Sequence, residues 1–221
     1  TPEKLRSMYQ DHADGTVTVQ FADGSRQQVE ELSYNERLLH STTKEGERWP
    51  ALLELALGQR LQQLKVGRPT SDQEPRAYLN QGQPAEVIFP LLLGYPGRTW
   101  ATAGLSPEQV RGLLEACLER GAVVAGSEPA LDNGIVDNHA YQVVAFDPER
   151  DRVTLANPWG NTHWNGAKDS QESGRFSMPF LHFYASFREV SSGLLQLPEH
   201  LRSPESAEEK EARQAMLELK F

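Results

Sequence analysis

One continuous stretch, residues 138–165, constrains the fold of this 221-residue chain more than any other. It holds two apolar segments, Ala140 to Phe146 and Arg152 to Ala156, that are rich in Val, Leu, Tyr and Phe. The segment Asp-Pro-Glu-Arg-Asp between them has the composition of a turn. The stretch therefore predicts two antiparallel strands that are joined by a short polar turn.

Pairing these strands about their turn places His139 opposite the segment from Asn157 to Trp159. Side chains along a strand point alternately to its two faces, so one face of the pair can be read from the sequence. That face is predicted to hold His139, Tyr141, Val143, Val153, Leu155 and Asn157. It is apolar except at one end, where an imidazole and a carboxamide meet.

This end of the pair suits nucleophilic catalysis. An amide oxygen of Asn157 can accept a hydrogen bond from one ring nitrogen of His139 and fix its tautomer. The other ring nitrogen is then free to activate a nucleophile, as in the Cys-His-Asn variant of the catalytic triad. Trp159 can cover the His–Asn bond and exclude water from it. A strand-end histidine and a turn-forming Asn-Pro without catalytic role are the alternative interpretation.

Several motifs resemble, in the same order, segments of calpain-type cysteine proteases. The resemblance covers roughly Gly15 to Val190. The motifs are Trp49 to Ala56 (Trp-Pro-Ala-Leu-Leu-Glu-Leu-Ala), Leu114 to Gly121, His139-Ala140-Tyr141, Asn157-Pro158-Trp159-Gly160, Trp164-Asn165-Gly166, and Gly174 to Met178 with Phe180 to Tyr184. The resemblance implies an α+β fold of the papain-like, two-lobe kind, incomplete at its N-terminus. It also implies catalytic roles for His139 and Asn157 and a supporting role for Trp159.

The resemblance also predicts how the chain is divided. Residues 1–82 correspond to the remainder of the first lobe, which carries the catalytic cysteine in the family. Residues 83–193 correspond to the second lobe, with the histidine and the asparagine. Residues 194–221 are highly charged and are predicted to form a helical tail or a linker.

The family's nucleophile is a cysteine in a Gln-Gly-x-x-x-Asp-Cys-Trp segment, and this sequence has no such segment. Its one cysteine, Cys117, shares an apolar helical face with Val110, Leu113 and Leu114, so we expect it in the core. The chain starts at Thr1 without an initiator Met, and we expect it to be a fragment of a longer protein.

The helices and other strands are predicted from apolar periodicity, turn residues and caps. We expect the end of a helix at Pro2 to Tyr9, strands at residues 16–21, 27–32 and 122–126, and helices at 49–65, 86–93 and 107–120. Loops are expected at 34–46, 67–84, 94–104, 128–137 and 164–174, and Phe176 to Val190 completes the second lobe.

Composition limits the partners. The formal net charge of −9 argues against nonspecific binding to nucleic acid or to an anionic membrane. No apolar run is long enough for a membrane span. A single cysteine forms no internal disulfide, which favours a reducing compartment. We expect a cytoplasmic protein or a secreted effector.

No cofactor is predicted. Calpains bind calcium through carboxylates around the segment that corresponds to residues 164–174. His163 and Arg175 stand where the family usually has acidic residues, although Asp169 and Glu172 remain. Because calcium takes six to eight oxygen ligands, we favour a solvated acidic loop over a calcium site.

The leading hypothesis is the His/Asn-bearing part of a calpain-like cysteine endopeptidase that acts on proteins or peptides. Its thiolate comes from sequence outside this chain, either upstream or on a second polypeptide. Two alternatives stay open: a catalytically inactive interaction or regulatory module derived from a protease, and the self-processing part of a larger secreted effector.

Overall fold

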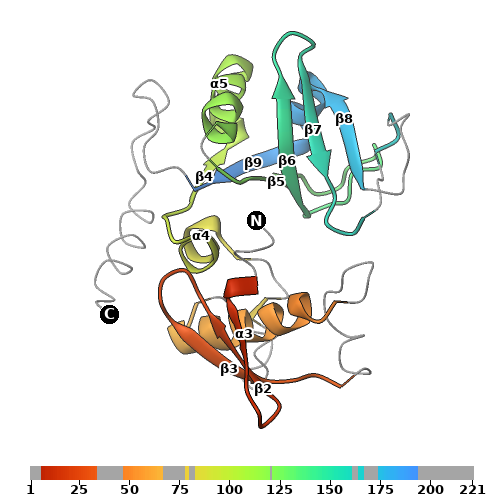
Figure 1. The fold of residues 1–221 in the computed structure, drawn as a ribbon. Coiled ribbons are helices and arrows are strands. Elements are labelled where there is room, and N and C mark those ends of the chain that lie inside the picture. Colours follow the sequence, from red (N-terminus) through yellow and green to blue (C-terminus); the bar gives the residue numbers. More distant parts are fainter. Residues whose placement is uncertain are drawn as a thin grey trace. The chain divides into compact units, whose positions relative to one another are not determined.

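The computed structural model describes residues 6–33, 47–66, 78–79, 83–119, 121–160, 164–166 and 174–193. The chain divides into two compact units, Thr1–Gly94 and Tyr95–Phe221 (Figure 1). The predicted lobe boundary at residue 82 and the predicted tail at 194–221 lie outside the described residues. The predicted loops at 34–46 and 67–84 lie wholly or mostly outside them too.

The first unit contains a three-stranded antiparallel sheet in the order β1 (Tyr9–Asp11), β2 (Thr16–Gln20) and β3 (Arg26–Glu30). Helix α3 (Trp49–Leu64) packs against it, and helix α4 (Ala85–Leu93) also belongs to this unit. Alternate residues of β2 and β3 are buried, as expected for strands with one solvated face. The buried core consists of Met8, Val17, Val19, Phe21, Val29, Leu52, Ala56, Leu57, Leu61, Tyr78 and Leu91.

The predicted hairpin and both predicted helices of this unit are confirmed, but its first strand was not foreseen. Tyr9 was expected at the end of a helix and instead begins β1, where it pairs with Val19 of β2. Such a short strand depends on its hydrogen-bonded neighbour more than on its own three residues.

The second unit contains a six-stranded antiparallel sheet in the order β4-β9-β5-β6-β7-β8. The strands are β4 (Arg98–Ala101), β5 (Val123–Ser127), β6 (Ala140–Asp147), β7 (Arg152–Ala156), β8 (Arg175–Pro179) and β9 (Phe187–Ser192). The other elements are the 3₁₀ turn η2 (Thr102–Gly104) and the helices α5 (Pro107–Leu118) and α6 (Phe180–Ser186). Together with the first unit, this arrangement of helices and antiparallel sheets confirms the predicted α+β class.

The expectation of a loop over residues 94–104 was wrong in part. Arg98 to Ala101 form β4, which pairs along its whole length with β9, far along the chain. A strand of four residues at the edge of a sheet is specified by that distant partner, and its own sequence carries little signal. The strand predicted at 122–126, the helix predicted at 107–120 and the pair around the polar turn are all found, with shifts of a few residues at their ends.

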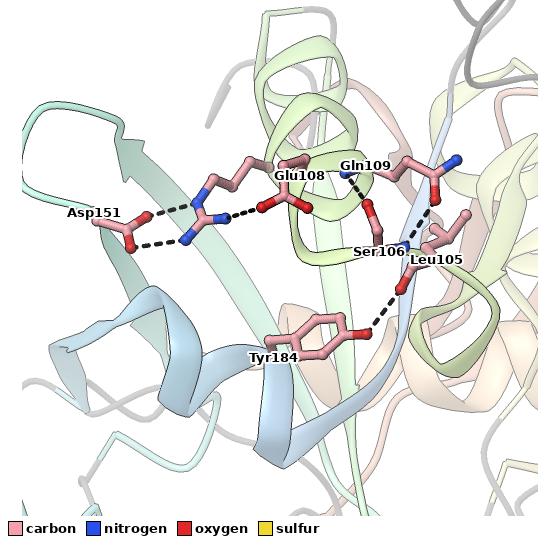
Figure 2. Close-up of polar contacts among 7 residues, drawn as sticks. Leu105, Ser106, Glu108, Gln109, Asp151 and Tyr184 are labelled. Atoms are coloured by element: carbon pink, nitrogen blue, oxygen red, sulfur yellow. Dashed lines mark hydrogen bonds and ion pairs between the residues drawn. The ribbon is translucent and has the colours of Figure 1, made fainter.

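The helices α5 and α6 cover the buried face of this sheet. Val110, Leu113, Leu114 and Cys117 of α5 share one core with Tyr141 and Val143 of β6, Val153 and Leu155 of β7, and Phe180 and Phe183 of α6. Ser106 caps α5 in a capping box with Gln109, since each side chain bonds the other residue's backbone N–H (Figure 2).

The turn of the β6–β7 hairpin is fastened to both helices. The guanidinium of Arg111 donates to both carboxylate oxygens of Asp151, at 2.8 and 2.9 Å (Figure 2). It also lies 4.0 Å from the centre of the Phe180 ring, in position for a cation–π contact. The backbone N–H of Phe180 donates to the carbonyl of Asp151 at 2.8 Å. One end of the hairpin is thereby fixed, and its other end carries His139 and Asn157.

Candidate active site

The residues that flank the β6–β7 hairpin are His139, directly before β6, and Asn157, directly after β7. The ladder pairs Val143 with Leu155 and Gln142 with Ala156. Extending this pairing toward the open end of the hairpin places Asn157 opposite Tyr141 and His139 opposite Trp159, so His139 and Asn157 are diagonal neighbours on one face. Nε2 of His139 lies 3.0 Å from Oδ1 of Asn157.

The hydrogen-bonding partners of Asn157 fix which ring nitrogen of His139 carries a proton. Oδ1 of Asn157 also accepts the backbone N–H of Trp159, at 3.1 Å. A backbone N–H can only donate, so the amide oxygen must face this side. Nε2 of His139 must therefore be a donor, and in the neutral ring Nδ1 is left with its lone pair. The arrangement holds the tautomer in which Nδ1 can act as a base.

A short turn after β7 holds the asparagine in place. The backbone N–H of Gly160 donates to the carbonyl of Asn157 at 3.0 Å, which closes a turn over Asn157-Pro158-Trp159-Gly160. This sequence has the residue preferences of a type I turn, with Asn first, Pro second and Gly last. The N–H of Asn157 donates to the carbonyl of Gly174 at 2.8 Å. Asn157 is almost fully buried, with 3% of the residue exposed.

Two aromatic rings contact the imidazole of His139. The indole of Trp159 lies with its centroid 4.3 Å away at an interplanar angle of 38°. The ring of Tyr141 meets the imidazole edge to face, with centroids 5.0 Å apart. Trp159 is itself 61% exposed, so one side of the indole covers the histidine and much of the rest faces outward. Apolar rings next to the His–Asn bond lower the local dielectric and strengthen it.

Side chains hold the backbone of the loop before His139. The carboxylate of Asp137 accepts the backbone N–H groups of Ala130 and Leu131, at 2.9 and 2.8 Å. Asn138 has a left-handed backbone with a φ of 49°, and its Oδ1 accepts a bond from Arg188 at 2.9 Å. The sequence indicated only an exposed loop here. The Asp, Asn and Gly residues of this loop favour specific turns, and they were the only indication in the sequence that its backbone is ordered.

Ser127 and the hydroxyl of Tyr141 were not recognised from the sequence, although both bond this loop. The hydroxyl of Ser127 accepts the N–H of His139 at 2.9 Å, and that of Tyr141 accepts the N–H of Val136 at 3.0 Å. Burial raises the pKa of Tyr141, more than the bond from Val136 lowers it, so the phenol stays protonated at neutral pH. No sequence signal separates such a serine from one that merely ends a strand.

Cys117 is confirmed as a core residue. It is fully buried on α5, in the same cluster as Leu113 and Leu114. A thiol without solvent access is not available to attack a peptide. The chain has no second cysteine.

Most of the residues on which the calcium prediction depends lie outside the described part of the chain. They are His163, Asp169 and Glu172. Arg175 is described and begins β8. Within the described ranges, no group of three or more His, Cys, Asp or Glu side chains is placed to hold a metal ion. The absence of a cofactor therefore stays a prediction. No helix among the described residues has the length and apolarity needed to cross a membrane.

The match to a known protein family covers most of the chain. The sequence model of the family described as calpain family cysteine protease matches residues 13–178. Calpain-13 of Rattus norvegicus is 31% identical over 75 residues, which cover 28% of this chain and 11% of that protein. Calpain-9 of Homo sapiens is 28% identical over 120 residues, 38% of this chain and 17% of that protein. The matched segments thus represent only a small part of these relatives.

Proposed function

The chain belongs to the calpain family of cysteine proteases, and from this premise we propose that it supplies the histidine and asparagine of a peptide-cleaving active site. Proteins are the substrates of a protease family, and hydrolysis of peptide bonds is its reaction. The observation that carries the proposal for this chain is the bond from His139 Nε2 to Asn157 Oδ1, because it leaves Nδ1 as a free base.

The proposed mechanism gives each residue one task. Nδ1 of His139 takes the proton of a cysteine thiol, and the thiolate attacks the carbonyl carbon of the scissile peptide. The imidazolium then returns that proton to the leaving amine, and water hydrolyses the thioester with the same histidine as base. Asn157 keeps the ring oriented through both steps. Trp159 limits the access of water to the hydrogen bond between His139 and Asn157.

The thiol in this mechanism comes from sequence outside the 221 residues. Cys117 is fully buried in the core and cannot serve. In the proposal, the missing Gln-Gly-x-x-x-Asp-Cys-Trp segment lies upstream in the same protein or on a second polypeptide. The oxyanion hole, which stabilises the tetrahedral intermediate, comes from that segment as well.

The decisive test is His139→Ala in the full-length protein, assayed by cleavage of an unfolded protein substrate. The matched control is His182→Ala, which removes an exposed histidine of α6 in the same unit. We expect loss of cleavage with His139→Ala alone and unchanged circular dichroism for both variants. Equal cleavage by wild type and His139→Ala contradicts the proposal.

The buried state of Cys117 also favours a second candidate, an interaction module derived from a protease that performs no turnover. Intact-mass analysis of the purified protein separates the two. A bound second polypeptide, or upstream sequence, that carries the Cys segment supports the protease. If neither the sample nor the gene contains such a segment, the interaction module is favoured instead.

A further inference from the structure

We propose that Ser127 is a positioning residue for His139, and this proposal rests on the catalytic role proposed for that histidine. Ser127 is the last residue of β5 and is fully buried. Its backbone N–H donates to the carbonyl of His139 at 3.0 Å, and its Oγ accepts the N–H of His139 at 2.9 Å. Both backbone polar groups of His139 are thereby bonded to this one serine.

The serine hydroxyl takes the place of a backbone carbonyl in the sheet. Regular pairing of β5 with β6 ends at Gly126 and Ala140. In an antiparallel ladder, a hydrogen-bonded pair exchanges two N–H to carbonyl bonds. Ser127 and His139 make one of these two bonds, from the N–H of Ser127 to the carbonyl of His139. In place of the second, the N–H of His139 bonds to Oγ of Ser127 and not to its carbonyl. The backbone of β5 also changes register at this point, between Gly126 and Ser127, in its pairing with β9.

The same hydroxyl fixes the loop before the histidine. Its Oγ lies 2.6 Å from the carbonyl oxygen of Val136 and 3.1 Å from that of His139, both of which can accept its proton. A hydroxyl has one proton, so the shorter bond to Val136 dominates. The N–H of Val136 in turn donates to the hydroxyl of Tyr141, which is fully buried. Two side-chain hydroxyls therefore bond both backbone polar groups of a residue close to His139.

Removing the hydroxyl should move the imidazole. Without it, the N–H of His139 and the carbonyl of Val136 lose this partner in a partly buried place, and such groups shift to find new ones. His139 depends on its backbone position to reach Asn157 at 3.0 Å. Misplacement of a reacting group by about 1 Å can cost on the order of a hundredfold in rate, and we expect a smaller shift here.

The test compares Ser127→Ala with Ser192→Ala. Ser192 is also fully buried, and its hydroxyl donates to the carbonyl of Ala122 at 3.1 Å. It pairs with Val123 at the opposite end of β5, so its removal costs a buried bond away from the histidine. We expect similar losses of thermal stability in both variants. Only Ser127→Ala should change the NMR shifts of the His139 ring, which report its stacking on Trp159, and make its Nε2 proton exchange faster.

In the full-length protease, Ser127→Ala should lower kcat by about tenfold with little change in KM, whereas Ser192→Ala should leave both near wild type. Ser127→Cys, which keeps a weak donor and acceptor, should recover part of the loss. If Ser127→Ala does not fold, Ser127→Cys takes its place in the NMR comparison, because its weaker donor and acceptor should shift the His139 resonances in the same direction by a smaller amount.

Unchanged His139 resonances in every folded variant overturn the positioning role. Equal effects of Ser127→Ala and Ser192→Ala on those resonances do so too. The NMR arm uses the 221-residue chain and needs no nucleophile. A shifted ring together with full activity of His139→Ala therefore refutes the catalytic proposal and leaves the positioning intact.

Discussion

Nε2 of His139 lies 3.0 Å from Oδ1 of Asn157, and strand pairing rather than closeness along the chain produces this distance. The pairing includes one irregularity, since the register of β6 shifts between Val143 and Ala145. Side chains alternate between faces, so a slip of one residue nearer the open end would turn His139 away from Asn157. The geometry of the site is therefore a property of the hairpin as a whole.

Replacing Asn157 with alanine should release the imidazole without unfolding the unit. The variant removes the acceptor of both the His139 ring and the Trp159 N–H. We expect a stability loss of about 1–3 kcal/mol, because those donors sit beside a buried site. In NMR spectra at a pH where the ring is neutral, the Nε2 proton of His139 should exchange too fast to be seen. A Nε2 resonance as slow to exchange as in wild type would contradict the assigned bond.

In the full-length protein, the same substitution should lower kcat by roughly 10- to 1000-fold, since the orienting member of a triad acts through the histidine. KM should change little, because Asn157 is buried and is not expected to touch the substrate. A change confined to KM would instead assign the asparagine to substrate binding.

Asn138, directly before the histidine, should tolerate glycine better than alanine. Its φ of 49° lies in the left-handed region, which glycine adopts freely and alanine does not. Both variants lose the bond from Arg188, so their difference isolates the backbone. We expect Asn138→Ala to unfold in urea with a free energy about 1 kcal/mol below that of Asn138→Gly. Equal midpoints and slopes would show that the left-handed backbone is not maintained in solution.

The sequence was most informative where local chemistry decides the structure. The cap of α5 at Ser106, the turn after Phe146 and the alternation along β6 and β7 could all be read from neighbouring residues. For this reason the meeting of His139 with Asn157 could be predicted.

The parts that could not be predicted depend on distant partners. The strands β1 and β4 are short and exist because β2 and β9 bond them. The hydroxyl of Ser127 bonds His139 at the residue where β5 changes register with the distant strand β9. Neither composition nor periodicity encodes a single side-chain hydrogen bond of this kind.

The bond between Arg111 and Asp151 predicts an acid-dependent loss of stability in the second unit. Hydrogen bonds from Arg111 lower the pKa of Asp151, more than burial raises it. A lowered pKa in the folded state gives stability that is present above the ordinary carboxyl pKa of 3.8 and lost as the pH falls through the lowered value. Because both side chains are partly exposed, solvent screening limits the contribution to about 0.5–1 kcal/mol.

Asp151→Asn tests this contribution without disturbing the backbone, since asparagine also accepts the left-handed φ of 51° at this position. Urea unfolding should show the variant less stable than wild type at neutral pH. The difference should shrink as the pH falls below 3.8. A difference that is the same at neutral and acid pH would mean that the ion pair does not contribute.

Tyr9 gives the first unit the opposite kind of pH dependence. Burial raises the pKa of its phenol from 10.0 to about 12, and its hydroxyl donates to the carbonyl of Trp49 at 3.1 Å. The protonated form is the one that the fold favours, so the stabilisation is complete below pH 10 and is lost as the pH rises from 10 toward 12.

Tyr9→Phe should cost about 1 kcal/mol at neutral pH through the lost hydrogen bond. It should also weaken the fall in stability above pH 10, as measured by urea unfolding, and remove one late-titrating phenolate from the ultraviolet absorbance titration. Parallel stability curves for wild type and Tyr9→Phe across that alkaline range would show that the phenol is not buried against Trp49, and would place the difference in the hydrogen bond alone.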